Sequence, residues 1–123
     1  MESIAHPTPA QAAGGDGEDR AAAFLVRQGL AILARNYRTR LGEIDLVARD
    51  GATLVFVEVR LRTGERFGGA VGSITARKRA RIVAAARQYL MRMKRVPPCR
   101  FDVMALDGDE VAWLRGAFDA GGG

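Results

Sequence analysis

The stretch GEIDLVARDGATLVFVEVRLR, residues 42–62, decides the fold because it predicts two β-strands joined by a tight turn. Asp50-Gly51 is a strong hairpin-turn signal. The residues on either side of it are rich in Val, Ile, Leu and Phe and predict strands at Glu43–Arg49 and Thr53–Arg62. The sequence therefore predicts an antiparallel hairpin in the middle of the chain.

This hairpin places carboxylates among its most apolar residues, although carboxylates are seldom fully buried without a partner. If the turn has two residues, Arg49 pairs with Ala52. That register puts Glu43 opposite Glu58, and it puts Asp45 diagonal to Glu58 on the same face, with Cβ atoms roughly 7 Å apart or less. Two carboxylates at this separation can hold one divalent cation between them.

The alternative interpretation of these acids is a solvated, salt-bridged face of a half-buried sheet. Arg60 and Arg62 share the face of Glu58. As cross-strand partners they could offset part of the negative charge of the acids on that face. Asp45 lies between Ile and Leu, and Glu58 lies between two Val residues. This apolar setting favours the metal site.

Elements on both sides of the hairpin complete an α/β fold. We predict a helix at Gly17–Gln28, a strand at Leu30–Arg38, a helix from Ala76 to about Lys94, a strand at Arg100–Leu106 and a short strand at Glu110–Leu114. The long helix lies between the strands at 53–62 and 100–106, as a parallel pair requires. The prediction is one domain at 16–118, a mixed sheet flanked by helices, between mobile tails at 1–15 and 119–123.

The charge distribution points to an anionic partner. The 123 residues carry a formal net charge of +5, and no acid occurs between Arg66 and Arg100. Such a surface binds phosphates without reading sequence, so nucleic acid is the expected partner, and DNA is expected before RNA. An acidic protein partner is the alternative. The expected nucleic-acid contacts are Arg62, Arg77, Lys78 and Arg81.

The rarity of two residue types excludes several site chemistries. Cys99 is the only cysteine and His6 the only histidine, so no internal disulfide, zinc site of several cysteines or His-based triad is expected. Any metal would need oxygen ligands, which favours Mg²⁺ or Mn²⁺. No apolar run approaches the ~20 residues of a membrane span, and we see no secretion signal, so the cytoplasm is the expected location.

Several motifs together resemble the YraN-like family of predicted endonucleases. They are GE at 17–18, RNYR at 35–38, GEIDLVARD at 42–50, VFVEVRLR at 55–62, the helix containing Lys78, and RFDV at 100–103. Asp45 followed by Glu58-Val59-Arg60 also resembles the PD-(D/E)xK nuclease signature. The resemblance implies a restriction-endonuclease-like core of the order α-β-β-β-α-β. It also implies a restriction-enzyme or Holliday-junction-resolvase type of activity.

The resemblance implies a role for each matching residue. Asp45 and Glu58 would be metal ligands, with the backbone carbonyl of Val59 as a further ligand. Glu18 would help to hold the metal or a bound water. Arg60 stands where the superfamily has lysine; it can contact a phosphate through two N–H groups but cannot lose its proton to act as a base.

The expected function is therefore Mg²⁺-dependent hydrolysis of phosphodiester bonds, on structured or branched DNA if the resolvase likeness holds. One alternative is a nuclease-like module that binds nucleic acid without cutting it, with Arg60 marking lost chemistry. Another is a protein-interaction domain whose basic helix meets an acidic partner. A resolvase-type role would require a homodimer, because two strands must be cut symmetrically.

Overall fold

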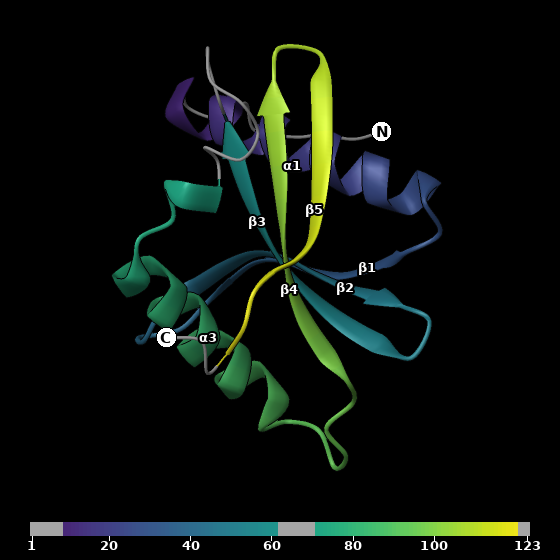
Figure 1. Cartoon of the computed structure of the whole chain (residues 1–123), viewed down its shortest axis with the longest axis vertical. Helices are drawn as coiled ribbons and strands as arrows, with labels where there is room; N and C mark the ends of the chain where they lie inside the picture. Colours follow the sequence, from purple (N-terminus) through teal and green to yellow (C-terminus); the bar gives the residue numbers. More distant parts are fainter. Residues whose placement is uncertain (1–8, 62–70, 121–123) are drawn as a thin grey trace.

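The computed structural model describes residues 9–61 and 71–120, with side chains from Asp16 onward in the first range. Within them the chain forms a mixed five-stranded sheet in the order β1-β2-β3-β4-β5, with a helix on each face (Figure 1). The elements are α1 (Pro9–Arg27), β1 (Ala31–Arg38), β2 (Glu43–Asp50), β3 (Thr53–Leu61), α3 (Ala76–Leu90), β4 (Cys99–Asp107) and β5 (Glu110–Phe118). This confirms the α/β class.

The direction of the strands follows from their connections. Strands β1, β2 and β3 pair antiparallel through short turns, and β4 pairs antiparallel with β5. The pairing of β3 with β4 is parallel, and α3 lies in the connection between them. A parallel pair needs such a long crossover, so the prediction made from the helical segment is confirmed.

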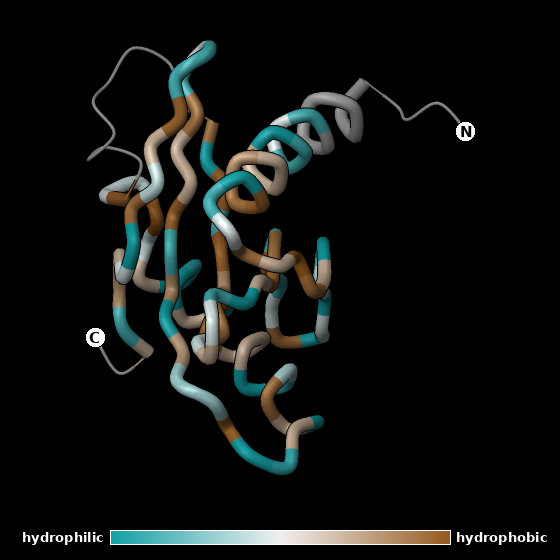
Figure 2. The backbone as a smooth tube through the Cα atoms, turned by 90° about the vertical axis from the view of Figure 1, so that its right-hand side faces the viewer, coloured by the Kyte–Doolittle hydropathy of each residue, from teal (hydrophilic) through white to brown (hydrophobic). Residues whose placement is uncertain are grey.

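The sheet is buried on both faces. On the α1 side, Ala21 and Leu25 pack against a cluster that includes Leu46, Val57 and Met104. On the α3 side the buried residues include Val47, Phe56, Val103, Ile82 and Ala86. Burial on two faces explains why the central strands are almost continuously apolar. In Figure 2 the β4–β5 turn is hydrophilic, in contrast to the hydrophobic segments of the strands.

Both helices differ from the predicted boundaries. Helix α1 begins at Pro9 rather than Gly17, so it extends into the segment expected to be a tail. Helix α3 begins as predicted, with Thr75 accepting a hydrogen bond from the backbone N–H of Lys78 at 3.0 Å. It ends at Leu90 rather than Lys94. Met91 is 78% exposed, so a further turn would have buried little apolar surface.

Strand β5 continues to Phe118 rather than ending at Leu114. The pairing of β4 with β5 shifts in register between Phe101 and Val103, and Gly116 takes a positive φ of 57° beside this shift. A glycine at a bulge lets the strand bend and resume its pairing. Phe118 then stacks on Phe101, with ring centroids 5.1 Å apart.

Within the described residues, no helix is both long and apolar enough to cross a membrane.

The close approach of Gly42 to α3 gives a testable consequence for stability. A Cβ atom at position 42 would lie 2.0 Å from the backbone carbonyl oxygen of Arg81, which cannot rotate away. We expect Gly42→Ala to lower the free energy of unfolding by about 2 kcal/mol or more, in the range of an overpacked site. Thermal unfolding measures this. Gly72→Ala is the control, since no atom of residues 16–61 and 71–120 lies within 4 Å of its added Cβ, and equal melting temperatures for the two variants would contradict the packing.

Candidate metal and phosphate site

The register of the hairpin differs from the predicted one. Leu46 pairs with Val57, and Asp50 pairs with Thr53, so Gly51 and Ala52 form the turn. Asp50 stays in the strand, where its carboxylate is 3.0 Å from a guanidinium nitrogen of Arg100 on β4. The correction moves the partner of Arg49 from Ala52 to Leu54 and leaves the faces unchanged, because the shift is an even number of residues.

The corrected register places the two acids at the end of the β2–β3 ladder. The pairing of β2 with β3 ends at Leu46 and Val57, so Asp45 and Glu58 are the next residues of the two strands. Their side chains are close enough for each to shift the pKa of the other. At this point Asp45 Oδ2 accepts a hydrogen bond of 2.8 Å from the backbone N–H of Val59. The Asp45 side chain thus accepts the hydrogen bond of the Val59 N–H just beyond the last backbone-paired residues of β2 and β3.

An irregularity in β1 and β2 coincides with Asp45. Ile44 and Val47 belong to the core on the α3 side, whereas Leu46 belongs to the core on the α1 side, so strict alternation fails at position 45. Asn36 lies between the β1 residues that pair with Ile44 and Leu46, and it has a positive φ of 50°. Asparagine tolerates this left-handed conformation better than most residues.

Burial shifts the acid–base equilibria of the pair. The Glu58 side chain is 4% exposed, and this burial, together with the adjacent charge of Asp45, raises the pKa of Glu58 to about 7. Burial also raises the pKa of Asp45, although the hydrogen bond from Val59 opposes the shift. The two carboxyls also hydrogen-bond to each other. Near neutral pH the pair therefore shares a proton, which a bound cation would displace into solvent.

Two positively charged side chains, Lys78 and Arg60, lie beside Glu58. The Nζ of Lys78 lies 3.6 Å from Glu58 Oε2, and Nη1 of Arg60 lies 3.4 Å from the same oxygen. A second guanidinium nitrogen of Arg60 donates to Ser73 Oγ at 2.9 Å. Lys78 was expected only as a surface contact to nucleic acid. Its position in α3, three residues after the cap Thr75, turns it toward the carboxylates instead.

The third acid of the site comes from α1. Glu18 Oε1 accepts a hydrogen bond of 2.9 Å from Asn36 Nδ2, and this bond orients it toward the strands. Its burial and the nearby charge of Asp45 raise the pKa of Glu18. The Asn36 side chain thus links β1 to the start of the described side chains of α1.

These residues surround one cavity of about 250 Å³. Its lining is Gly17, Glu18, Asp45, Glu58, Val59, Arg60, Leu61 and Lys78. Four acidic or basic residues predicted for the site, Glu18, Asp45, Glu58 and Arg60, are thus brought together with Val59. Among the described residues no three acidic, His or Cys side chains lie close enough to form a larger metal-binding group, so the inner carboxylate set is a pair.

The other predicted contacts lie elsewhere. Arg77 and Arg81 are exposed on α3 and do not line the cavity. Arg62 lies outside the described residues.

Asp102 is a buried acid that sequence reasoning did not single out. It is fully buried and accepts hydrogen bonds from Trp113 Nε1 at 2.8 Å, the backbone N–H of Gly116 at 2.9 Å and Nε of Arg100 at 3.1 Å. These hydrogen bonds compensate the negative charge of the Asp102 carboxylate, and they link it to β5 at the bulge between β4 and β5. Asp102 is structural, and it does not line the cavity. The only feature of the sequence that could have indicated this role is the position of Asp102 inside a predicted strand of mostly apolar residues.

Known proteins match nearly the whole described domain. A model of the family described as "Uncharacterised protein family UPF0102" matches residues 17–106. A UPF0102 protein of Cupriavidus taiwanensis is 62% identical over 112 residues, which cover 89% of this chain and 85% of that relative. One from Methylibium petroleiphilum is 56% identical over 117 residues, covering 89% and 96% of the two chains. The matched residues include every member of the cavity lining.

Proposed function

Given that the chain belongs to the uncharacterised protein family UPF0102, we propose that it is a divalent-metal-dependent endonuclease with a restriction-endonuclease-like core. Its substrate is a phosphodiester bond of nucleic acid, with structured or branched DNA as the first candidate. The single observation that carries the proposal is the pair formed by the buried Glu58 and the half-buried Asp45, in an open cavity flanked by Lys78 and Arg60.

The carboxylate pair supports a cation site because it is costly without one. Two acids that face each other at the end of a strand ladder repel when both are ionised, and burial adds to the cost. The hydrogen bond from the Val59 N–H satisfies one lone pair of Asp45, and the Asp45 carboxyl also interacts with Glu58 itself. Natural proteins keep such pairs where a bound cation or a shared proton offsets the charge.

The donor set fits a hard cation. Asp45 and Glu58 would hold Mg²⁺ or Mn²⁺, with the backbone carbonyl of Val59 as a further oxygen ligand. Glu18, at the edge of the same cavity, would hold a water beside it. When bound, the cation supplies Lewis-acid chemistry, because it offsets negative charge on a phosphate and makes water easier to deprotonate.

The positively charged side chains of Lys78 and Arg60 are suited to bind a phosphate. Lys78 and Arg60 approach the same carboxylate oxygen and line the cavity, so a phosphate entering it would meet two positive charges. Arg60 offers two N–H groups to non-bridging oxygens but stays protonated. Lys78 is a mobile point charge that can follow the charge as it develops on the leaving oxygen. The chain thus provides a lysine, although not at the position where the sequence signature expects one.

The basic face of α3 supports nucleic acid as the substrate. Arg77 and Arg81 are exposed next to Lys78, and the described part of the chain from 71 to 100 has no acid. Lysine and arginine on one helix bind a phosphate backbone with little sequence preference and strong dependence on salt.

A second candidate function is a nuclease-like module that binds without cutting. One observation favours it: the Arg60 guanidinium is engaged by both Glu58 and Ser73, as a structural cross-link would be. In that case the carboxylate pair would remain protonated and no cation would be needed.

Cleavage assays separate the two candidates. The protein is incubated with single-stranded, duplex, flap and four-way-junction DNA and with RNA, in Mg²⁺, Mn²⁺ or EDTA. We expect strand scission on at least one substrate in either metal, none in EDTA, and binding that weakens steeply as salt is raised. Binding without metal-dependent cleavage of any substrate would favour the second candidate. Absent or salt-insensitive binding would contradict both.

A further inference from the structure

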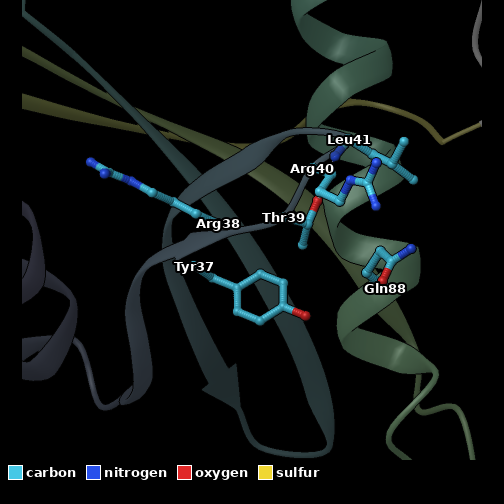
Figure 3. A pocket seen from close by; sticks show the side chains of 6 residues that line it. All are labelled: Tyr37, Arg38, Thr39, Arg40, Leu41 and Gln88. Atoms are coloured by element: carbon cyan, nitrogen blue, oxygen red, sulfur yellow. Dashed lines mark hydrogen bonds between the residues drawn. The ribbon is translucent and has the colours of Figure 1, made fainter.

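A second and larger cavity lies away from the carboxylates, between the β1–β2 turn and the C-terminal half of α3. Its volume is about 610 Å³, within the range of small-ligand pockets. The residues that line it are Tyr37, Arg38, Thr39, Arg40, Leu41 and Gln88. Figure 3 shows Arg40, Leu41 and Gln88 close together on one side and the Tyr37 hydroxyl directed toward Gln88, while Arg38 points away.

The wall formed by the β1–β2 turn is firmly held. Thr39 Oγ1 accepts hydrogen bonds from the backbone N–H groups of Leu41 and Gly42 at 3.0 and 3.1 Å, and the Thr39 N–H donates to the Gly42 carbonyl at 2.8 Å. Gly42 in turn lies against the backbone of Arg81 on α3. The cavity is therefore shaped before any ligand arrives, which lowers the cost of binding.

Polar groups without partners converge on this cavity. Neither the Arg40 guanidinium, the Gln88 amide nor the Tyr37 hydroxyl has a hydrogen bond or ion pair within residues 9–61 and 71–120, although Gln88 and Tyr37 are half-buried. Arg38, by contrast, is paired with Glu43 at 3.4 Å. These three groups are reached by solvent and have no protein partner among the described residues, so they are available to a ligand.

The side chains that line the cavity offer the contacts that a single nucleotide would use. Gln88 offers a donor and an acceptor side by side, as the edge of a nucleobase does. Leu41 is 52% exposed and, with the Tyr37 ring, provides apolar surface for the base. Arg40 provides a free guanidinium for the phosphate, and Arg92 adds positive charge nearby, stacked 5.8 Å from the centroid of Tyr37.

We propose that this cavity binds an unpaired nucleotide of the nucleic-acid strand, with the base against Gln88, Leu41 and Tyr37 and the phosphate on Arg40. The base must be unpaired, because pairing and stacking in a duplex cover the edge and faces that the cavity would contact. The assignment rests on the nucleic-acid substrate proposed above. It narrows that substrate to one with a single-stranded segment, such as a flap, a loop or an opened junction.

The position of the cavity agrees with the carboxylate site. Lys78 and Gln88 lie on the same helix, ten positions apart in the numbering, which corresponds to about 15 Å along its axis. That is on the order of four stacked nucleotide steps at 3.4 Å each. Arg81 lies between them on α3 and is exposed, so one strand can contact the cavity, the basic helix and the carboxylate site together.

Binding measurements in EDTA test the cavity without any cleavage. Fluorescence anisotropy compares the full chain and its variants on labelled oligothymidylate and on a blunt-ended, fully paired duplex of similar length. Gln88→Ala and Arg40→Ala are expected to weaken binding of the single strand roughly tenfold, as for loss of a base contact. Gln88→Ala should leave binding of the duplex unchanged. Arg49→Ala, which removes an exposed arginine of β2 outside the cavity, is the charge-matched control and should have a much smaller effect.

The outcomes separate this inference from the proposed nuclease. Thermal melts first establish that each variant is as stable as the parent. Equal loss of affinity for the single strand and for the blunt duplex in Gln88→Ala, or no loss on either, would overturn the cavity assignment even if metal-dependent cleavage is found. Competition by polyglutamate as strong as by oligothymidylate would overturn it in favour of an acidic protein partner. A selective loss on single strands would support it even if no substrate is ever cleaved.

Discussion

Asp45→Asn is expected to abolish metal-dependent cleavage while leaving the fold intact. The amide oxygen of asparagine can still accept the hydrogen bond from the Val59 N–H, so the end of the β2–β3 ladder is preserved. The negative charge that would hold the cation is lost. Loss of about 4 kcal/mol of transition-state stabilisation corresponds to a rate reduction on the order of 10³-fold. The rate of scission of the best substrate, in saturating Mg²⁺, measures it.

The matched control is Asp50→Asn. Asp50 is on the same strand but pairs with Arg100 and does not line the cavity, so its replacement should leave the cleavage rate unchanged. Both variants should bind nucleic acid in EDTA about as well as the parent. Equal cleavage by the parent and by Asp45→Asn would show that the activity comes from a contaminant or from a different site.

Glu58→Gln is expected to stabilise the protein at alkaline pH and not at acidic pH. The pKa of Glu58 is raised in the folded protein from 4.5 to about 7, with burial as the main cause. Below pH 4.5 the carboxyl is protonated in both the folded and the unfolded chain. Between these values folding takes up a proton, and above pH 7 the native state carries an ionised, buried carboxylate. The parent therefore loses about 3 kcal/mol of stability as pH rises from 4.5 to above 7.

Glutamine removes this dependence because it does not titrate. Urea unfolding in EDTA at pH 5 and pH 8 measures the effect, and Glu110→Gln on β5, an exposed position, is the control expected to follow the parent. If Glu58→Gln and the parent show the same pH dependence, the proton-sharing pair is wrong. Excess Mg²⁺ should stabilise the parent at pH 8 and have little effect on Glu58→Gln, because a ligand stabilises only the state that binds it.

Much of the fold could be predicted from local signals. The hairpin, the helix after Thr75 and the parallel crossover followed from turn residues, a cap and the spacing of apolar residues. The errors lie where tertiary contacts compete with local preference. The ion pair with Arg100 keeps Asp50 in its strand and moves the turn onward, and Gly116 lets β5 continue through a bulge to Phe118.

Most residues of the candidate site could be named from the sequence, but how the elements bring them together could not. The expectation that Asp45, Glu58 and Arg60 lie together came from period-two alternation on adjacent strands, and it survived because the register differs from the predicted one by an even number of residues. Val59 was assigned from the family resemblance. Lys78 could not be assigned, because whether a helical cation faces solvent or a strand depends on how the helix is docked. Asn36 could not be assigned either, since its left-handed conformation depends on the irregularity opposite Asp45.

By itself the sequence determined which chemistry the protein can offer: oxygen ligands for a hard cation and an excess of arginine for phosphates. These properties depend on residue types, which are the same in any fold. Only the tertiary structure decided that Asp45 and the buried Glu58 line one cavity with Lys78 beside them, and that Tyr37, Arg40 and Gln88 converge on a separate cavity. Burial and proximity arise from the docking of α1 and α3 on the sheet, and they change a pKa or create a binding surface in ways that composition cannot.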